Sequence, residues 1–147
     1  MGYKVERYHD FCAGHRVHKH ESKCRHLHGH NYRVHFTCEP KEGLDSIGRV
    51  IDFSMVKSLL CEWLEDNWDH KFIAWREDPV IIALEAASVG SSEIMESIVW
   101  VPFNPTAENM AAYLVDVVGP AQLAGTDVKL TKVVIDETRK CSAVYEA

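Results

Sequence analysis

The chain has 147 residues, 46% of them hydrophobic and 26% charged, which is ordinary for one globular domain. Its formal net charge of −6 argues against a nucleic-acid partner, and its five cysteines fit no disulfide scaffold. The first residues form no secretory leader and no apolar run is long enough to span a membrane, so we expect a cytoplasmic protein without a membrane partner.

Two extended segments near the N-terminus predict a long antiparallel hairpin. Residues 3–14 carry the aromatic and β-branched side chains of a strand. Residues 28–39 alternate in polarity, with Tyr32, Val34 and Phe36 on one face. The loop that joins the two strands is rich in histidine, lysine and arginine.

Helical signals follow the hairpin. Asp52 or Ser54 can cap a helix over residues 54–67, where apolar residues recur at helical spacing. Asp78 directly before Pro79 predicts the start of a second, short helix. The remaining expected elements are the end of the first helix over 68–75, a loop over 88–93, a short strand over 97–103, a helix from Pro105-Thr106, and strands over 127–137 and 141–146.

This order of elements predicts an α+β fold in which an antiparallel sheet carries helices on one face. Residues 1–147 are expected to form one domain, because the length suits a single hydrophobic core. The segment at about 73–100 separates the two main helices and is interpreted as an insertion into that domain.

Histidines are concentrated in one region, since residues 9–36 hold eight of the nine in the chain. His28 and His30 point to the same face of a strand, and His15 can reach them across the hairpin. Three neutral imidazoles with one open position form the pattern of a catalytic zinc site. Two alternatives stay open: a chance surface pair, or a closed structural site in which Cys24 is the fourth ligand.

The loop after His15 is strongly basic, because seven of its eleven residues over 16–26 are basic or titratable. Such a loop on an acidic protein attracts a phosphorylated ligand and lowers the pKa of Cys24. The alternative is a solvated loop whose charges have no specific role. The seven residues are Arg16, His18, Lys19, His20, Lys23, Arg25 and His26.

Six ordered sequence blocks give the chain a family resemblance: FCAGHRV, CRHLHGHNYRV, VIDFSMVK, WDHKF, NPTAENMAAYL and DETRKCSAVYE. The chain resembles the 6-pyruvoyl-tetrahydropterin synthase superfamily, most closely the bacterial 6-carboxytetrahydropterin synthases of queuosine biosynthesis. The three residues between Cys24 and His28 are similar to that bacterial branch. The longer segment between WDHKF and NPTAEN departs from the family pattern.

The resemblance implies a T-fold, in which an antiparallel four-stranded sheet with helices on one face assembles into oligomeric barrels such as a hexamer. Its active sites lie between subunits. Its implied site residues are the Zn²⁺ ligands His15, His28 and His30, the catalytic base Cys24, the catalytic pair Asp69 and His70, the pterin anchor Glu137, and the pocket residues Thr106 and Glu108.

Simpler roles compete for several of these residues. Asp69 and His70 can be a surface acid and a histidine at a helix end. Glu137 can be an exposed glutamate at a hairpin end, although a carboxylate also matches the guanidine-like edge of a pterin through two hydrogen bonds. Thr106 can simply cap the helix that begins there, and Glu108 suits its first turn.

The implied reaction converts 7,8-dihydroneopterin triphosphate into 6-carboxy-5,6,7,8-tetrahydropterin, with release of acetaldehyde and triphosphate. One alternative is 6-pyruvoyltetrahydropterin synthesis, which shares the site but omits carbon–carbon cleavage. Others are a non-catalytic zinc-binding protein and a pterin-binding module without turnover. No phosphate-binding glycine motif or dinucleotide fingerprint occurs, which agrees with a reaction that needs no nicotinamide.

Overall fold

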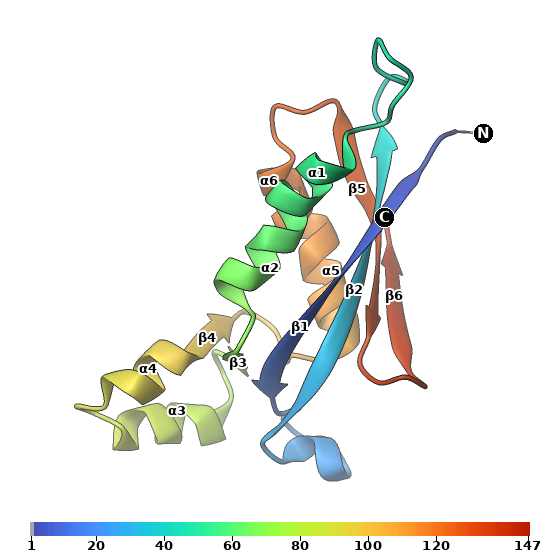
Figure 1. Ribbon diagram of the computed structural model, residues 1–147. Coiled ribbons are helices and arrows are strands. Elements are labelled where there is room, and N and C mark those ends of the chain that lie inside the picture. The colour runs from blue at the N-terminus through green and yellow to red at the C-terminus, as the bar shows by residue number, and fades with distance from the viewer. Residues whose placement is uncertain (1) are drawn as a thin grey trace.

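A single twisted sheet organises residues 2–147, which the computed structural model describes. The strand order is β4-β3-β1-β2-β5-β6 (Figure 1). The neighbouring pairs β1–β2, β2–β5 and β5–β6 are antiparallel, whereas β3 pairs in parallel with both β1 and β4. The strands are β1 (Val5–His15), β2 (His28–Pro40), β3 (Lys71–Trp75), β4 (Ile98–Val101), β5 (Val128–Asp136) and β6 (Ser142–Glu146).

The predicted antiparallel strands are present, but the prediction of a sheet with only four strands was wrong. The sheet has six strands, because β3 and β4 extend it with parallel pairing. The segment of β3 had been assigned to the end of a helix, since periodicity cannot distinguish a short apolar run on a strand from one on a helix. β4 coincides with a predicted strand, whose membership of the same sheet had not been foreseen.

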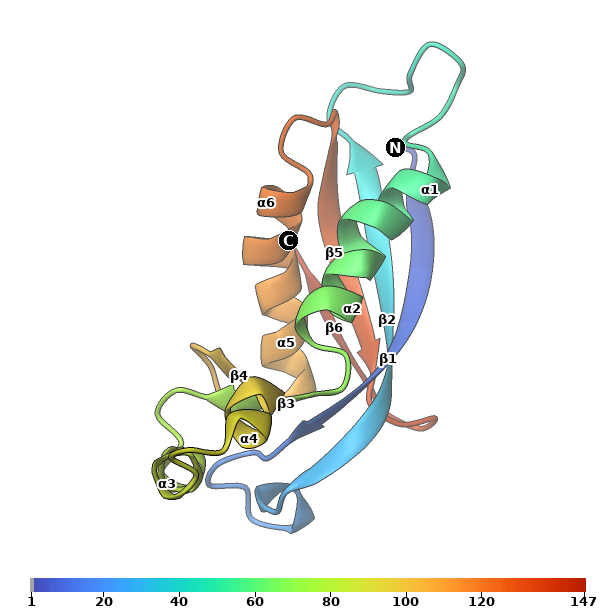
Figure 2. The same cartoon turned by 60° about the vertical axis from the view of Figure 1, so that its left-hand side comes forward.

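Two helical stretches cover one face of the antiparallel strands (Figures 1 and 2). Each begins at a side-chain cap: Asp52 accepts from the Ser54 amide, and Thr106 accepts from the Asn109 amide. The first stretch consists of the consecutive segments α1 (Phe53–Val56), η2 (Lys57–Cys61) and α2 (Glu62–Asn67). The second stretch consists of the consecutive segments α5 (Ala107–Tyr113), η3 (Leu114–Val118) and α6 (Gly119–Gln122).

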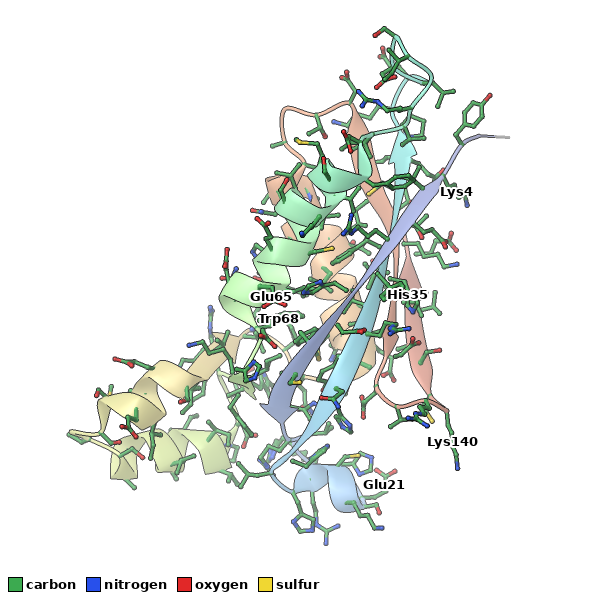
Figure 3. All side chains as sticks on the ribbon, viewed as in Figure 1. Lys4, Glu21, His35, Glu65, Trp68 and Lys140 are labelled. Carbon is green, nitrogen blue, oxygen red and sulfur yellow. The ribbon has the colours of Figure 1, made fainter. Side chains whose placement is uncertain are left out.

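The core lies between this helical layer and the sheet. Alternation along β1 and β2 turns Phe11 and Tyr32 inward, where their rings stack with centroids 5.2 Å apart. Trp68, at the end of α2, packs against Phe11 at 6.2 Å. Figure 3 shows Trp68 on the helical side of the sheet and His35 on the opposite side. The inward side chains therefore fix which face of the hairpin each histidine occupies.

The segment over residues 76–97, here called the α3–α4 segment, lies beyond β3 at one end of the sheet (Figure 2). It contains α3 (Pro79–Ala87), which begins as predicted with Asp78 as its cap and proline in its first turn, and α4 (Ser92–Ser97). The start of α4 overlaps the predicted loop over 88–93, so the loop is shorter than expected. None of the helices over residues 2–147 combines the length and apolar character that a membrane span requires.

Candidate active site

The three predicted zinc ligands converge at one end of the β1–β2 hairpin. His15 lies directly opposite His28 in the strand ladder, and His30 lies opposite Ala13. The ring centroids are 4.6 Å apart for His15 and His28, 5.1 Å for His15 and His30, and 4.8 Å for His28 and His30. One nitrogen from each ring lies within 4.8 Å of those of the other two. The structure thus brings the three imidazoles together as the sequence predicts.

Backbone carbonyls fix the tautomers of two of these histidines. Nδ1 of His15 donates to the Pro105 carbonyl at 2.7 Å, and Nδ1 of His28 donates to the His26 carbonyl at 2.7 Å. A carbonyl oxygen can only accept, so each Nδ1 carries the proton and each Nε2 keeps a lone pair. The two Nε2 atoms face each other at 3.1 Å. This arrangement of opposed lone pairs fits a cation between them.

His30 completes the donor set. Its Nε2 is buried and has no hydrogen-bond partner among the described residues, although Glu137 Oε1 lies 3.1 Å away. Three imidazoles with unused acceptor nitrogens suit zinc, which favours nitrogen ligands and a tetrahedral shell with one open position. His15, His28 and His30 would therefore hold the ion that the resemblance implies.

Burial favours the neutral form of His15 and of His30, which is the form that a metal ligand requires. Burial lowers the pKa of His15 to about 4. Burial also lowers the pKa of His30, against an opposing effect of the nearby Glu137 carboxylate. Tyr32 lies beneath the cluster with its hydroxyl 3.3 Å from both ring nitrogens of His15, and burial raises its pKa above the usual value.

Cys24 lies in the short helical turn η1 (Lys23–Arg25) of the β1–β2 loop. Its carbonyl accepts from the Val17 amide at 2.7 Å, which folds the loop back on itself. Among the described residues, the group whose ligand atoms converge comprises only the three histidines. The structure therefore does not form the closed shell with Cys24 as a fourth ligand that was one alternative.

Asp69 and His70 attach the start of β3 to β1. Asp69 Oδ1 accepts from the Cys12 amide at 3.0 Å, and the His70 amide donates to the Cys12 carbonyl at 2.7 Å. His70 adopts φ 59°, in the left-handed region, and its exposed ring lies with Nδ1 2.8 Å from Asp69 Oδ2. Burial opposes ionisation of Asp69, but hydrogen bonds from Cys12 and His70 outweigh it and lower its pKa.

A cavity of about 900 Å³ contains Asp69, His70 and Glu137 in its lining. A second cavity, of about 520 Å³, contains His30 and His70. Glu137 follows β5 directly. Because β5 pairs with β2, which carries His30, the Glu137 carboxylate lies beside that histidine. Of the catalytic residues implied by the resemblance, Asp69, His70 and Glu137 thus line the larger cavity, whereas Cys24 lines neither cavity.

The second cavity has an unusual wall. Gly14 and Gly29 face each other in the β1–β2 ladder and both line it. A Cβ on Gly14 would lie 2.8 Å from Phe72 Cδ2, and a Cβ on Gly29 would lie 3.1 Å from the Ala13 carbonyl oxygen. The absence of a side chain at Gly29 therefore lets the neighbouring strand β1 approach closely.

Thr106 and Glu108 line neither cavity. Thr106 caps α5, with its hydroxyl accepting from the Asn109 amide at 3.1 Å, as its simpler predicted role requires. Glu108 is in the first turn of that helix. The residue of this motif that reaches the cluster is Pro105, which sequence reasoning missed because its contribution is a main-chain carbonyl.

Comparisons with known proteins agree with this geometry. The sequence profile of the family described as 6-pyruvoyl tetrahydropterin synthase matches residues 4–147. The chain is 34% identical, over 90% of its length and 91% of the relative, to a Rickettsia typhi protein named 6-carboxy-5,6,7,8-tetrahydropterin synthase. An Aquifex aeolicus protein of the same name is 32% identical over 99% of both chains.

Solved structures show the same fold. A Wolinella succinogenes protein described as uncharacterized superposes with a TM-score of 0.86 at 28% identity, covering 99% of this chain and 98% of that one. The Caenorhabditis elegans 6-pyruvoyl tetrahydropterin synthase superposes with a TM-score of 0.66 at 23% identity, covering 99% and 95%. Since the profile match runs through nearly every residue, the chain belongs to the 6-pyruvoyl tetrahydropterin synthase family.

Proposed function

We propose that the chain is a zinc-dependent lyase, a 6-carboxytetrahydropterin synthase. It would convert 7,8-dihydroneopterin triphosphate and water into 6-carboxy-5,6,7,8-tetrahydropterin, acetaldehyde and triphosphate, in the biosynthesis of queuosine. The observation that carries this proposal is the convergence of one ring nitrogen from each of His15, His28 and His30, with the Glu137 carboxylate beside His30. The names of the relatives above 30% identity favour this product over 6-pyruvoyltetrahydropterin.

Glu137 is the proposed anchor of the pterin. Its carboxylate borders the larger cavity, and two hydrogen bonds from the amino group and ring N–H of a pterin would satisfy both oxygens. This contact orients the substrate side chain toward the histidine cluster, because the same carboxylate lies 3.1 Å from His30 Nε2. Zinc, when bound, supplies Lewis acidity that makes the side-chain protons of the substrate easier to remove.

Cys24 is the proposed base that takes a proton from the substrate side chain. It lies in the loop between His15 and His28, which are both ligands, so the loop is fixed at each end close to the cluster. Cysteine is one of the side chains that act as general bases when they are positioned at the proton to be removed.

His70 and Asp69 are the proposed proton shuttle. Asp69 accepts from Nδ1 of His70, which leaves Nε2 of the exposed ring free to exchange protons with substrate or water. Thr106 and Glu108 remain proposed substrate-binding residues. They lie at the start of α5, directly after Pro105, whose carbonyl accepts a hydrogen bond from His15.

We also propose that the protein is a homo-oligomer, a hexamer or similar, with active sites between subunits. Two surfaces support this. No helix among residues 2–147 covers the sheet face that carries Tyr8, Arg33 and His35 (Figure 3). The helix α3 exposes Val80 and Ile82, although a helix with so little polar surface is normally covered.

Incubation of the zinc-loaded protein with 7,8-dihydroneopterin triphosphate tests the function directly. Acetaldehyde is measured by its reduction with alcohol dehydrogenase, triphosphate by ion chromatography and the pterin product by mass. Equal yields of acetaldehyde and triphosphate are expected. Triphosphate without acetaldehyde would identify the pyruvoyl reaction, and bound but unchanged substrate would identify a pterin-binding module.

A further inference from the structure

A buried ion pair joins the β1–β2 loop to the α3–α4 segment. Arg16, next to the ligand His15, is 8% exposed, and Asp78 is 1% exposed. Arg16 Nη1 donates to Asp78 Oδ1, which also accepts from the Val80 amide at 3.0 Å as the cap of α3. The other oxygen, Oδ2, is buried without a hydrogen-bond partner among the described residues. Arg16 is therefore the cation that compensates a carboxylate otherwise cut off from water.

The same guanidinium fastens the far end of the loop. Arg16 Nε donates to the Arg25 carbonyl at 2.9 Å. Beside this bond, the Val17 amide donates to the Cys24 carbonyl at 2.7 Å. These two bonds run in parallel between the start and the end of the loop, so the position of Cys24 depends on where Arg16 is held.

Arg25 lies between the proposed base Cys24 and His26. The His26 carbonyl accepts from Nδ1 of His28 and so sets the tautomer of that ligand. A displacement of Arg25 would move the sulfur of Cys24 and this carbonyl together. Arg16 and Asp78 line neither cavity, so their effect on the site passes through the Arg25 carbonyl.

The α3–α4 segment, which carries Asp78, is itself held to the sheet by hydrogen bonds. Trp100 of β4 donates through Nε1 to Glu85 Oε2 of α3 at 3.1 Å. Lys71 of β3 donates through Nζ to the Glu96 carbonyl of α4 at 3.0 Å. Both helices are thus bonded to strands of the sheet, and the sheet in turn carries the ligand histidines.

We propose that Arg16 and Asp78 are positioning residues, through which the α3–α4 segment holds the β1–β2 loop so that Cys24 and the His26 carbonyl stay in place beside the histidine cluster. This inference rests on the proposed function for the role of Cys24. It assigns the α3–α4 segment, which departs from the family pattern, a part in shaping the site.

Two substitutions separate positioning from stability. Arg16→Lys keeps a positive charge against Asp78, but a point-like ammonium cannot reproduce the planar fork that bonds Asp78 and the Arg25 carbonyl together. Asp78→Asn keeps the cap of α3, because asparagine caps helices as well as aspartate, but removes the charge. Thermal melting identifies any variant that has lost its fold.

Three measurements follow the positioning itself. Both variants are expected to bind zinc about 10-fold more weakly in chelator competition, as loss of an outer partner of a ligand typically does. We expect the Val17 amide to exchange hydrogen about 10-fold faster, since its bond to Cys24 opens more often. The kcat is expected to fall about 10-fold with KM nearly unchanged, because the cavities keep their lining.

Asp52→Asn is the matched control. Asp52 also caps a helix, accepts from the Ser54 amide at 2.9 Å and lies 3.4 Å from Arg49. It is exposed, however, and α1 begins near the end of the hairpin opposite to the β1–β2 loop (Figure 1). Its zinc affinity, amide exchange at Val17 and kinetic constants are expected to match those of the unmodified chain.

The inference is overturned if Arg16→Lys and Asp78→Asn match the control in zinc affinity and in hydrogen exchange at Val17. It is also overturned if the two variants melt at a lower temperature while zinc affinity and Val17 exchange stay unchanged. If the unmodified chain shows no turnover, the proposed function fails, while zinc affinity and amide exchange still decide the inference.

Discussion

In two histidines of the cluster, one ring nitrogen is occupied by a hydrogen bond to a main-chain carbonyl. His15 and His28 each give Nδ1 to a carbonyl, so Nε2 is left for a metal. His28→Ala is expected to lower the zinc retained after dialysis to below about a tenth of that of the unmodified chain, since only two of three ligands remain. Zinc content by mass spectrometry checks this result.

His26→Ala is the control for that substitution. It removes a histidine from the same loop but keeps the carbonyl that orients His28, so zinc content is expected to stay unchanged. Equal zinc content in the two variants would show that His28 is not a ligand.

Cys24 is expected to serve turnover without holding the metal. Cys24→Ala should keep its zinc and lose about 100-fold or more in kcat, the usual contribution of a general base. Cys141→Ala removes an exposed thiol, while the main-chain bond from the Glu137 amide to the Cys141 carbonyl remains, and should keep full activity. Loss of zinc from Cys24→Ala would instead identify a structural metal site.

At the scale of elements, the contact between β1 and β3 depends on an ionised Asp69. Its pKa is lowered in the folded chain, so the folded state holds the proton less tightly than the unfolded state does. The resulting stability is present above the unfolded pKa near 3.8 and is lost as the pH falls through the folded pKa. Unfolding by denaturant between pH 6 and pH 3 is therefore expected to show a shallower loss of stability in Asp69→Asn.

Asp66→Asn is the control for this comparison, because Asp66 is an exposed residue of α2, the helix that ends just before Asp69. Its loss of stability with falling pH should follow that of the unmodified chain. Identical pH profiles for Asp69→Asn and the unmodified chain would contradict the role of Asp69 in joining the strands.

Elements with a regular period or a cap were predictable, and those without were not. Asp52, Asp78 and Thr106 cap helices as their sequence positions indicate, and the hairpin alternation placed the histidines correctly. β3 is too short to show a period. Its parallel pairing with β1 aligns Lys71 with Ala13 and Ile73 with His15 through the main chain, which no residue type reveals.

The side chains of the candidate site were predictable from the sequence, but the contacts that hold them in place were not. Side chains with distinctive chemistry, such as His28, His30 and Glu137, could be found from residue type, spacing and family resemblance. The Pro105 carbonyl and the Arg16 link to Asp78 could not, because they join segments far apart in the sequence through contacts that only the fold creates.

At the scale of the whole molecule, sites between subunits predict that two inactive variants can restore each other. Cys24→Ala and His70→Ala alter opposite sides of the proposed shared site. When the two are dissociated, mixed and reassembled at random, about a quarter of the sites combine two intact contributions, so activity is expected to return to about that fraction. Turnover of the mixture and molar mass by light scattering check both parts.

Cys24→Ala mixed with His30→Ala is the control, because both substitutions fall on the metal side of the site. No activity is expected from that mixture. A monomeric protein with full activity, or restoration in neither mixture, would contradict active sites shared between subunits.

The facing glycines of the hairpin limit how this cavity can change. Where Gly14 and Gly29 meet, the floor of the smaller cavity is peptide backbone, and even a methyl group at either position would collide with or crowd its neighbours. Substitutions cannot reshape such a floor without shifting the strands that carry the histidines. Variation in what the cavity admits must therefore arise from other residues of its lining, such as Lys71 and Ser97.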